Sequence, residues 1–515
     1  MKKFVVLSLI ALLVLAFGTM AFAQAKEEPK LNFVASGFID VIGNYIRNVP
    51  QPGASTSAAG ATGPADNFFG PPVAYMMPAA KQAFDNKMTY VENRGRLKFD
   101  AIMGKEMMGT FFFEFDSTRW GERIPAGSTA QRQYAGFWGV ADRSSLELKN
   151  MFLTFGMPWV PVPITVQAGI IPMAIRPAFF LATDGPGIQA AVKIDPAQVR
   201  LIWMKALENK DWAADDINLY GIEAFAKIST ISVGGYAVYF NANSYPVGDG
   251  EPSYASEVGW YGVYATGKLG PVILSADLGM NRGEISDRRD TLTRARDVKL
   301  RGWGGILDVR FPWEKFVFGF ASIYGSGADQ SKTSSNGLPG SYVASGSGTS
   351  RKVGAYIIPV GKEGTPGHSI ILCGNGIINR NNTGFEPGAS TYYARATFGG
   401  LWINKIIASF QVTPIYKVTL EGMYVRDTTK KGNTIGNARK APYLTTDMRD
   451  DKSIGWEIDL YNEVALYKNL KFAIGGGILF AGKAMDYWDS TVVTADKNVS
   501  PKNPWIIATS ITYSF

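Results

Sequence analysis

The sequence predicts an all-β protein: a transmembrane, antiparallel, up-and-down β-barrel of about eighteen strands, with sixteen as the alternative. Three observations lead to this fold class. The last strand alternates between apolar and small polar residues, the connections between strands alternate in length, and the chain begins with an export signal. Because a barrel strand hides its hydrophobicity in every second residue, no long apolar stretch is needed.

Residues 1–23 form a predicted secretory signal peptide. Two lysines precede the apolar run 4–17, and Ala21-Phe22-Ala23 is a small-x-small cleavage site. We therefore expect residues 24–515 to form the mature chain as a single barrel. Beyond the signal, no stretch is apolar over the roughly 18 residues that a transmembrane helix needs.

The C-terminal segment 505–515 reads WIIATSITYSF. Its odd-numbered residues are largely apolar with aromatic residues at both ends, and its even-numbered residues are small and mostly carry hydroxyl groups. Successive side chains of a strand point to opposite faces. A membrane barrel needs this arrangement, with lipid on one face, water on the other and aromatic residues at the headgroup levels. The alternative is an ordinary strand of a soluble sandwich.

Eighteen segments alternate in this way, and short and long connections follow one another between them. The predicted strands are 32–47, 88–103, 109–119, 145–155, 164–172, 187–194, 198–207, 216–228, 231–241, 256–268, 272–282, 297–311, 315–325, 398–412, 417–427, 453–467, 470–482 and 504–515. Pro, Gly, Asp and Asn in the short connections favour tight turns. The longest connections, which we expect to be external loops, are 48–87, 120–144, 326–397 and 428–452.

Two of these strands depart from regular alternation. In 216–228 and 297–311 the apolar parity changes midway, at Gly221 and near Gly304-Gly305. A bulge centred on glycine is the expected explanation, and a wrong strand assignment is the alternative.

Charged residues of strand 88–103 share one face. The set is Glu92, Arg94, Arg96, Lys98 and Asp100. A Lys or Arg that faces lipid at the bilayer midplane costs roughly 2–4 kcal/mol, so we expect these side chains to line water as a basic ladder on the lumen wall. Glu114 and Asp116 of the next strand are expected to face the ladder, because neighbouring strands of opposite charge can pair.

Later strands continue the polar inner face. Asp277 in one strand, and Glu457 and Asp459 in another, alternate with apolar residues that are expected to face outward. The set as a whole predicts the wall of a water-filled pore. The alternative is that the charges pair only to stabilise the lumen.

The connection 173–186 has an unusually apolar middle, Ala178-Phe179-Phe180-Leu181. Such a segment must pack against something, and the barrel interior is the available partner. We expect it to act as a constriction loop that carries Arg176 and Asp184. Asp184 would face the basic ladder across the pore and set a transverse field. The alternative is a loop packed on the rim or at a subunit contact.

Several classes of function are disfavoured by composition. The only histidine is His368, in the long connection 326–397, so a His-dependent nucleophile–base pair would rest on this one residue, and we do not expect an enzyme. His368 and Cys373 lack further metal ligands at suitable spacing, and we expect no cofactor. The net charge of +8 comes without a basic cluster, so no nucleic-acid partner is expected.

Several short motifs resemble a known family. They read RGRLKFD at 94–100, FFFEFD at 111–116, ELKNMFLTF at 147–155, AGIIPM at 168–173 and DGPGIQAAV at 184–192. Together they resemble the homotrimeric porins in the outer membrane of sulfate-reducing and related bacteria, most clearly over residues 30–325. The terminal Phe515 is similar to the C-terminal signature that the barrel-assembly machinery reads.

The resemblance implies a homotrimer in the outer membrane, surrounded by lipid and lipopolysaccharide. It also implies passive diffusion of small hydrophilic solutes and ions, with Arg94, Arg96 and Lys98 as the basic wall and 173–186 as the constriction. The alternative function is a substrate-specific channel for an anionic polysaccharide or oligosaccharide. Sugar channels use inward-facing aromatic residues, for which Tyr261 and Tyr461 are the candidates.

Overall fold

The computed structural model describes most of the predicted barrel. The described residues are 30–48, 87–105, 107–120, 146–208, 216–245, 254–287, 298–329, 352–359, 369–372, 399–436, 438–442, 448–489, 492, 494 and 496–515. The predicted signal peptide lies outside them, as do His368, Cys373 and most of the three connections 48–87, 120–144 and 326–397. Helices of the length and hydropathy needed to cross a bilayer are absent from these described ranges.

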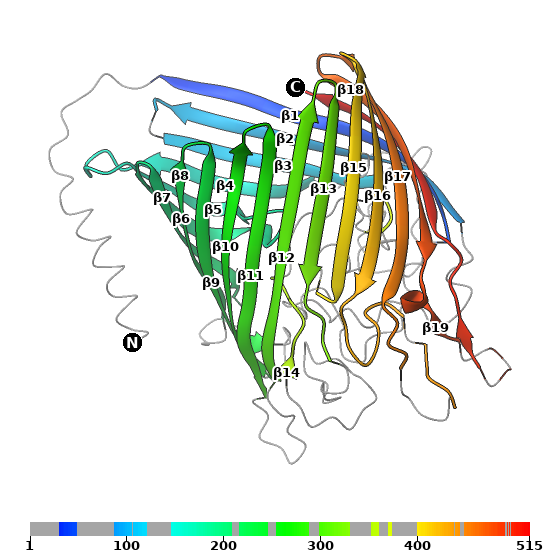
Figure 1. Ribbon diagram of the computed structural model, residues 1–515. Coiled ribbons are helices and arrows are strands. Elements are labelled where there is room, and N and C mark those ends of the chain that lie inside the picture. Colours follow the sequence, from blue (N-terminus) through cyan, green and yellow to red (C-terminus); the bar gives the residue numbers. More distant parts are fainter. Residues whose placement is uncertain are drawn as a thin grey trace, which may run out of the picture.

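Eighteen long strands make up the barrel (Figure 1). They are β1 (Leu31–Arg47), β2 (Lys87–Met103), β3 (Met107–Arg119), β4 (Leu146–Gly156), β5 (Ile164–Ile175), β6 (Leu181–Ile194), β7 (Ala197–Leu207), β8 (Ile217–Ile228), β9 (Ile231–Tyr245), β10 (Tyr254–Leu269), β11 (Val272–Asp287), β12 (Val298–Trp313), β13 (Phe316–Gly325), β15 (Leu401–Thr413), β16 (Tyr416–Asp427), β17 (Ser453–Tyr467), β18 (Leu470–Ala481) and β21 (Trp505–Ser514). The shorter elements are β14 (Lys352–Val353), β19 (Tyr487–Trp488), β20 (Asn498–Val499) and the 3-10 helix η3 (Lys483–Met485).

The sheet closes on itself. Each long strand pairs antiparallel with the next along the chain, and β1 pairs with β2 on one side and with β21 on the other. The two-residue strand β14 runs parallel to the start of β12, and β13 pairs directly with β15. The predicted all-β, eighteen-stranded antiparallel barrel is therefore confirmed, and the sixteen-stranded alternative is not.

The two ends of the barrel differ as the lengths of the connections predict. The tight turns, such as those after β8 and β10, lie at the same end as the C-terminus, and the strand ends that lead into the long connections lie at the other (Figure 1). At the short-turn end, Phe515 closes the ring, because its N–H donates to the Gly37 carbonyl (3.0 Å) and its carbonyl accepts from the Gly37 N–H (2.9 Å).

The outer surface of the barrel is apolar. In β21 the side chains of Ile507 and Tyr513 are each 45% exposed, whereas Ile506 and Ala508 on the opposite face are fully buried. The same alternation recurs around the ring, with Leu278 exposed between the buried Asp277 and Gly279 on β11. Since an exposed apolar belt is stable only in an apolar solvent, the barrel is of the transmembrane type.

The two predicted bulges are absent. β8 keeps a continuous register with β9 through Gly221, and β12 keeps one with β11 through Gly304 and Gly305. The side chains of Ile217 and Leu219 still point inward, where they are buried. The same set of alternate residues therefore faces inward along the whole strand. What changes is the character of the inward side chains, which are apolar at one level of the lumen and polar at another.

Part of the lumen is filled. A buried apolar cluster lies on the inner face of most strands. Its members come from β1, β5 to β10, β12, β13, β15 to β18 and β21, and it includes Phe179 and Phe180 from the turn after β5 and Tyr356 from the connection between β13 and β15. Segments 352–359 and 369–372 of that connection contact inward-facing residues of β10, β11 and β17. The connection 326–397, predicted to be external, is therefore partly internal, because its apolar residues bury against the inner wall.

Candidate functional site: the inner wall and its constriction

The basic ladder of β2 lies on the inner face of the barrel. Arg94 and Arg96 both pair with Glu114 on β3, and the Arg96 Nε–Oε2 distance is 3.0 Å. Lys98 pairs with Asp100 on its own strand (2.8 Å) and is the most exposed of the three cations, at 39% of its side chain. The Arg96 guanidinium also lies 5.8 Å from the ring centroids of both Phe38 and Phe112. Neighbouring strands thus hold this cation in place by charge and by cation–π contact.

Glu114 connects the ladder to the next strands. The carboxylate is almost fully buried, and Lys149 on β4 approaches it at 3.6 Å while binding Asp184 on β6 at 2.6 Å. Three cations, Arg94, Arg96 and Lys149, therefore share this one buried carboxylate. Burying a charge is stable only with such partners.

Lys149 is an inner-wall residue of the candidate site that the sequence pattern missed. In the pairing of β3 with β4, Phe112 opposes Asn150 and Phe113 opposes Leu148, which leaves Lys149 as an extra residue in a bulge. Strict alternation puts Lys149 and Asn150 on opposite faces. In the structure both side chains bind Asp184, since the Asn150 amide donates to its Oδ1 at 2.8 Å. A bulge re-aims side chains in this way.

Asp184 lies beside the ladder, not across the pore from it. It sits on β6, and Lys149 on β4 of the same wall links it to Glu114 and the ladder. The expected geometry across the constriction is therefore wrong. The physical reason is that Lys149, on the same wall as Asp184, lies closer to this carboxylate than the cations of the ladder do and binds it. Asp116 lies in β3, and its side chain is outside the described part of the structure.

The predicted constriction loop 173–186 is shorter than expected. Met173 pairs with Thr183 and Pro172 with Asp184, so most of this segment extends the hairpin of β5 and β6. The turn itself is 176–180, in which the N–H groups of Phe179 and Phe180 both donate to the Arg176 carbonyl at 2.8 Å. Arg176 adopts a left-handed conformation (φ +47°), which turns the chain sharply.

The tip of this turn packs inside the barrel, in agreement with the argument from its apolar sequence. Phe180 stacks on Tyr236 of β9 at 4.8 Å between ring centroids, and Phe179 stacks on Tyr356 at 5.5 Å. Tyr236 is three strands from β6 and Tyr356 lies on an internal segment, so the turn must project into the lumen past β7 and β8 to reach them. It thereby narrows the interior.

Arg176 anchors the turn to β11, five strands along the wall from β6. Its guanidinium binds Asp277 on β11 through two nitrogen atoms, with an Nη2–Oδ2 distance of 2.8 Å, and Nη2 donates to the Ser275 hydroxyl at 3.0 Å. The same guanidinium lies 4.3 Å from the ring centroid of Tyr264. The Tyr264 hydroxyl in turn donates to Glu223 at 3.0 Å. A bidentate pair of this kind fixes both position and orientation.

A second segment is held by the acidic pair of β17. Glu457 accepts hydrogen bonds from the backbone N–H groups of Ile371 (2.7 Å) and Leu372 (2.9 Å) and from the Ser369 hydroxyl (3.2 Å). Asp459 accepts from the Ile370 N–H at 3.2 Å. Both carboxylates are buried. Thus these two predicted pore-wall residues hold a piece of the β13–β15 connection inside the barrel and are covered by it.

The remaining internal segment, 352–359, rests on β10 and β11. The Trp260 indole donates to the Ile357 carbonyl at 2.8 Å, and the Ile357 N–H donates to the Asn281 side chain at 3.1 Å. Burial raises the pKa of Tyr356 well above its ordinary value, so this phenol stays neutral where it stacks on Phe179.

Sequence reasoning also missed the buried ion pair of Lys405 on β15 with Glu421 on β16. Glu421 lies directly opposite Asp459 in the register, so this pair supplies a cation beside the acidic residues of β17. Of the two aromatic candidates for a sugar path, Tyr461 is buried on the inner face, but Tyr261 is outward and 49% exposed. The described residues contain no cluster of His, Cys, Asp and Glu able to hold a metal ion.

Comparison with known proteins returns structures only. No protein-family model and no curated protein matches the chain. Among solved structures, OccK11 (OpdR) of Pseudomonas aeruginosa is 9% identical over 96% of this chain and 99% of its own, with a TM-score of 0.46. A BenF-like porin from Pseudomonas fluorescens Pf-5 is 11% identical over 94% and 98% (TM-score 0.45). OccAB1 of Acinetobacter baumannii is 10% identical over 93% and 97% (TM-score 0.44). These values are too low to transfer a role to this chain.

Proposed function

We propose that the protein is an outer-membrane porin, a channel through which small hydrophilic solutes and ions diffuse passively. The observation that carries the proposal is the difference between the two faces of the barrel wall. The outer face is apolar, and the inner face bears the cations Arg94, Arg96 and Lys98 on β2 and Lys149 on β4. Charged side chains on the inside of a closed barrel require water or partners, and the 39% exposure of Lys98 leaves room for water.

The orientation follows from the two ends of the barrel. Short turns face the periplasm and long connections face the outside in bacterial outer-membrane barrels. On this basis the end of the barrel with the C-terminus is periplasmic. We also propose that the barrel-assembly machinery binds Phe515, and the 46% exposure of this residue at the closure of the ring supports the proposal. The family resemblance adds the proposal of a homotrimer.

The interior supports a narrow passage. The turn 176–180 projects into the lumen and the segments 352–359 and 369–372 occupy further space within it. The water path then runs along the wall of β2 to β4, where the partly exposed cations lie. Anions of small cross-section are the solutes that this wall favours.

A substrate-specific channel for an anionic saccharide is the second candidate. The narrowing of the lumen and the basic ladder favour it. It loses one of its two aromatic contacts, however, because Tyr261 faces outward. A saccharide path built on inward aromatic rings would thus have to rely on other residues.

Planar-bilayer recordings of the mature, folded chain test the proposal. We expect stepwise ion conductance, closure in three equal steps if the protein is a trimer, and a reversal potential in a salt gradient that shows anion preference. Block of the current by anionic oligosaccharides, but not by small anions, would favour the second candidate. A folded protein that gives no conductance above that of the bare bilayer would overturn both.

A further inference from the structure

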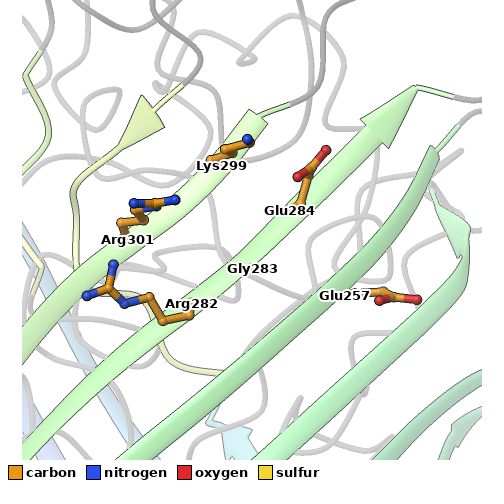
Figure 2. A pocket seen from close by; sticks show the side chains of 6 residues that line it. All are labelled: Glu257, Arg282, Gly283, Glu284, Lys299 and Arg301. Carbon is orange, nitrogen blue, oxygen red and sulfur yellow. The ribbon is translucent and has the colours of Figure 1, made fainter.

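An open pocket of about 420 Å³ lies on the barrel wall near the end with the long connections, apart from the inner wall described above. Figure 2 shows its lining on three adjacent strands, with Glu257 on β10, Arg282 and Glu284 on β11, and Lys299 and Arg301 on β12. All five side chains are charged.

The pocket faces outward. On β11 the inward side chains are Asp277 and Asn281, both buried, whereas Met280 is 41% exposed. Arg282 and Glu284 continue the parity of Met280. On β12 the inward Leu300 is buried, and Lys299 and Arg301 share the parity of the exposed Trp303.

The register arranges these side chains in rows around the barrel. The outermost row is Glu257, Glu284 and Lys299; the next contains Arg282 directly opposite Arg301; the third is Tyr261, Met280 and Trp303. Since the third row belongs to the apolar belt with two aromatic residues, the charged rows lie at the level of the lipid headgroups.

The arginine pair is the unusual feature. Like charges directly opposite one another on neighbouring strands destabilise a sheet. Neither Arg282 nor Arg301 makes an ion pair with any residue that the structure describes. Two guanidinium groups side by side form a suitable site for a phosphate group, which each can bind through two nitrogen atoms.

We propose that this pocket binds the phosphorylated glucosamine headgroup of lipopolysaccharide, that is, lipid A. Arg282 and Arg301 hold the phosphate, Lys299 adds a third cation, and Tyr261, Met280 and Trp303 contact the first part of the acyl chains. Glu257 and Glu284 accept hydrogen bonds from sugar hydroxyls, a feature that favours a glycolipid over a simple phospholipid. The inference rests on the proposed outer-membrane orientation, which places the long connections and this pocket in the outer leaflet.

The test uses the full mature chain in detergent and native mass spectrometry, with diphosphoryl lipid A as the probe. Phosphatidylglycerol and inorganic phosphate serve as the alternative sources of the anion. We expect saturable binding of lipid A and weaker binding of both alternatives. The double variant Arg282→Gln/Arg301→Gln should bind lipid A about tenfold more weakly for each arginine removed, since each loses a charge-assisted bidentate contact.

Two further variants make the result specific. Arg282→Lys/Arg301→Lys keeps the charge but loses the fork geometry, and should bind with intermediate affinity. Lys193→Gln/Lys227→Gln removes the same charge from exposed positions beside the short turns and should bind as the unmodified chain does.

Three outcomes would overturn the proposal. The first is that phosphatidylglycerol or phosphate binds as tightly as lipid A, and the second is that the glutamine variant keeps its affinity for lipid A. The third is that this variant loses its oligomers but keeps bound lipid A, which would assign the two arginines to a subunit contact. Conductance in bilayers free of lipopolysaccharide is measured in parallel. A chain that conducts but does not bind lipid A contradicts this inference alone, and a chain that does neither contradicts the channel as well.

Discussion

The wall of β2 to β4 and the wall of β9 to β11 face the same lumen in different ways. The first carries Arg94, Arg96 and Lys149 around one buried carboxylate. None of the contacts given above joins this wall to a described segment of the connections. The second carries Tyr236 and Trp260, against which the turn 176–180 and segment 352–359 pack. One wall holds charge, and the other holds inserted chain.

The difference follows from what each inner face can bind. Aromatic rings on β9 and β10 gain free energy only if apolar groups cover them, so they recruit Phe180 and its turn. Cations on β2 need carboxylates and water, and repel apolar insertions. On the proposed channel function, we therefore expect the packed wall to set the width of the passage and the charged wall to set its ion preference.

Removing the ring of Phe180 should break the packed wall most severely. Phe180→Ala leaves a cavity between Tyr236 and Trp260, and core substitutions of this type cost about 3–5 kcal/mol. We expect a lower thermal unfolding temperature and a larger single-channel conductance, because the turn loses the ring contacts that hold it against β9 and β10. Phe180→Leu, which keeps most of the volume, is the control. Unchanged conductance in the alanine variant would show that the turn does not limit the passage.

The acidic pair of β17 offers a second way to open the lumen. Glu457→Ala deprives the N–H groups of Ile371 and Leu372 of their acceptor, and each buried unsatisfied group costs about 1–3 kcal/mol. We expect segment 369–372 to detach, with a rise in conductance and faster proteolysis of the β13–β15 connection. Glu463→Ala, on the same strand but bonded to Lys417, is the matched control. Equal behaviour of the two variants would remove Glu457 from the constriction.

Alternation in the sequence was enough to predict the barrel but not its contents. All eighteen long strands were predicted, because each has to separate lipid from the lumen residue by residue. Strand limits were less accurate: β6 begins at Leu181 and not at 187, since its hairpin with β5 continues past the predicted loop. The two-residue strand β14 has no periodicity to detect.

The inner site was harder to predict for two physical reasons. A single bulge brings Lys149 to the same side as Asn150, and alternation gives no warning of it. Contacts such as Glu457 with Ile371 join residues 86 positions apart, and depend on where the connection folds. Two signals were usable. The charge parity of strand 88–103 correctly put Arg94 and Arg96 inside beside Glu114, and the apolar loop between barrel strands correctly indicated that Phe179 and Phe180 pack inside.

Neutralising the ladder should change selectivity more than structure. With Arg94, Arg96 and Lys98 replaced by Gln, the charged wall keeps Lys149 but loses three cations. We expect the reversal potential in a salt gradient to move toward cation preference, with little change in conductance. Replacement of Lys193, Lys227 and Lys268, exposed near the short turns, is the charge-matched control. If both sets shift the potential equally, the effect belongs to net charge and not to the wall.

Lys149→Met should give the smallest change and separates the two roles of the charged wall. The variant removes the cation between Glu114 and Asp184, yet Glu114 keeps both arginines and Asp184 keeps the Asn150 amide. Because each carboxylate retains a partner, the stability loss should stay within about 1–2 kcal/mol, below the cost of breaking a buried pair outright. The reversal potential should move in the same direction as in the ladder variant, but less. A shift as large as that of the triple replacement would make Lys149, the residue in the bulge, the main determinant of selectivity on this wall.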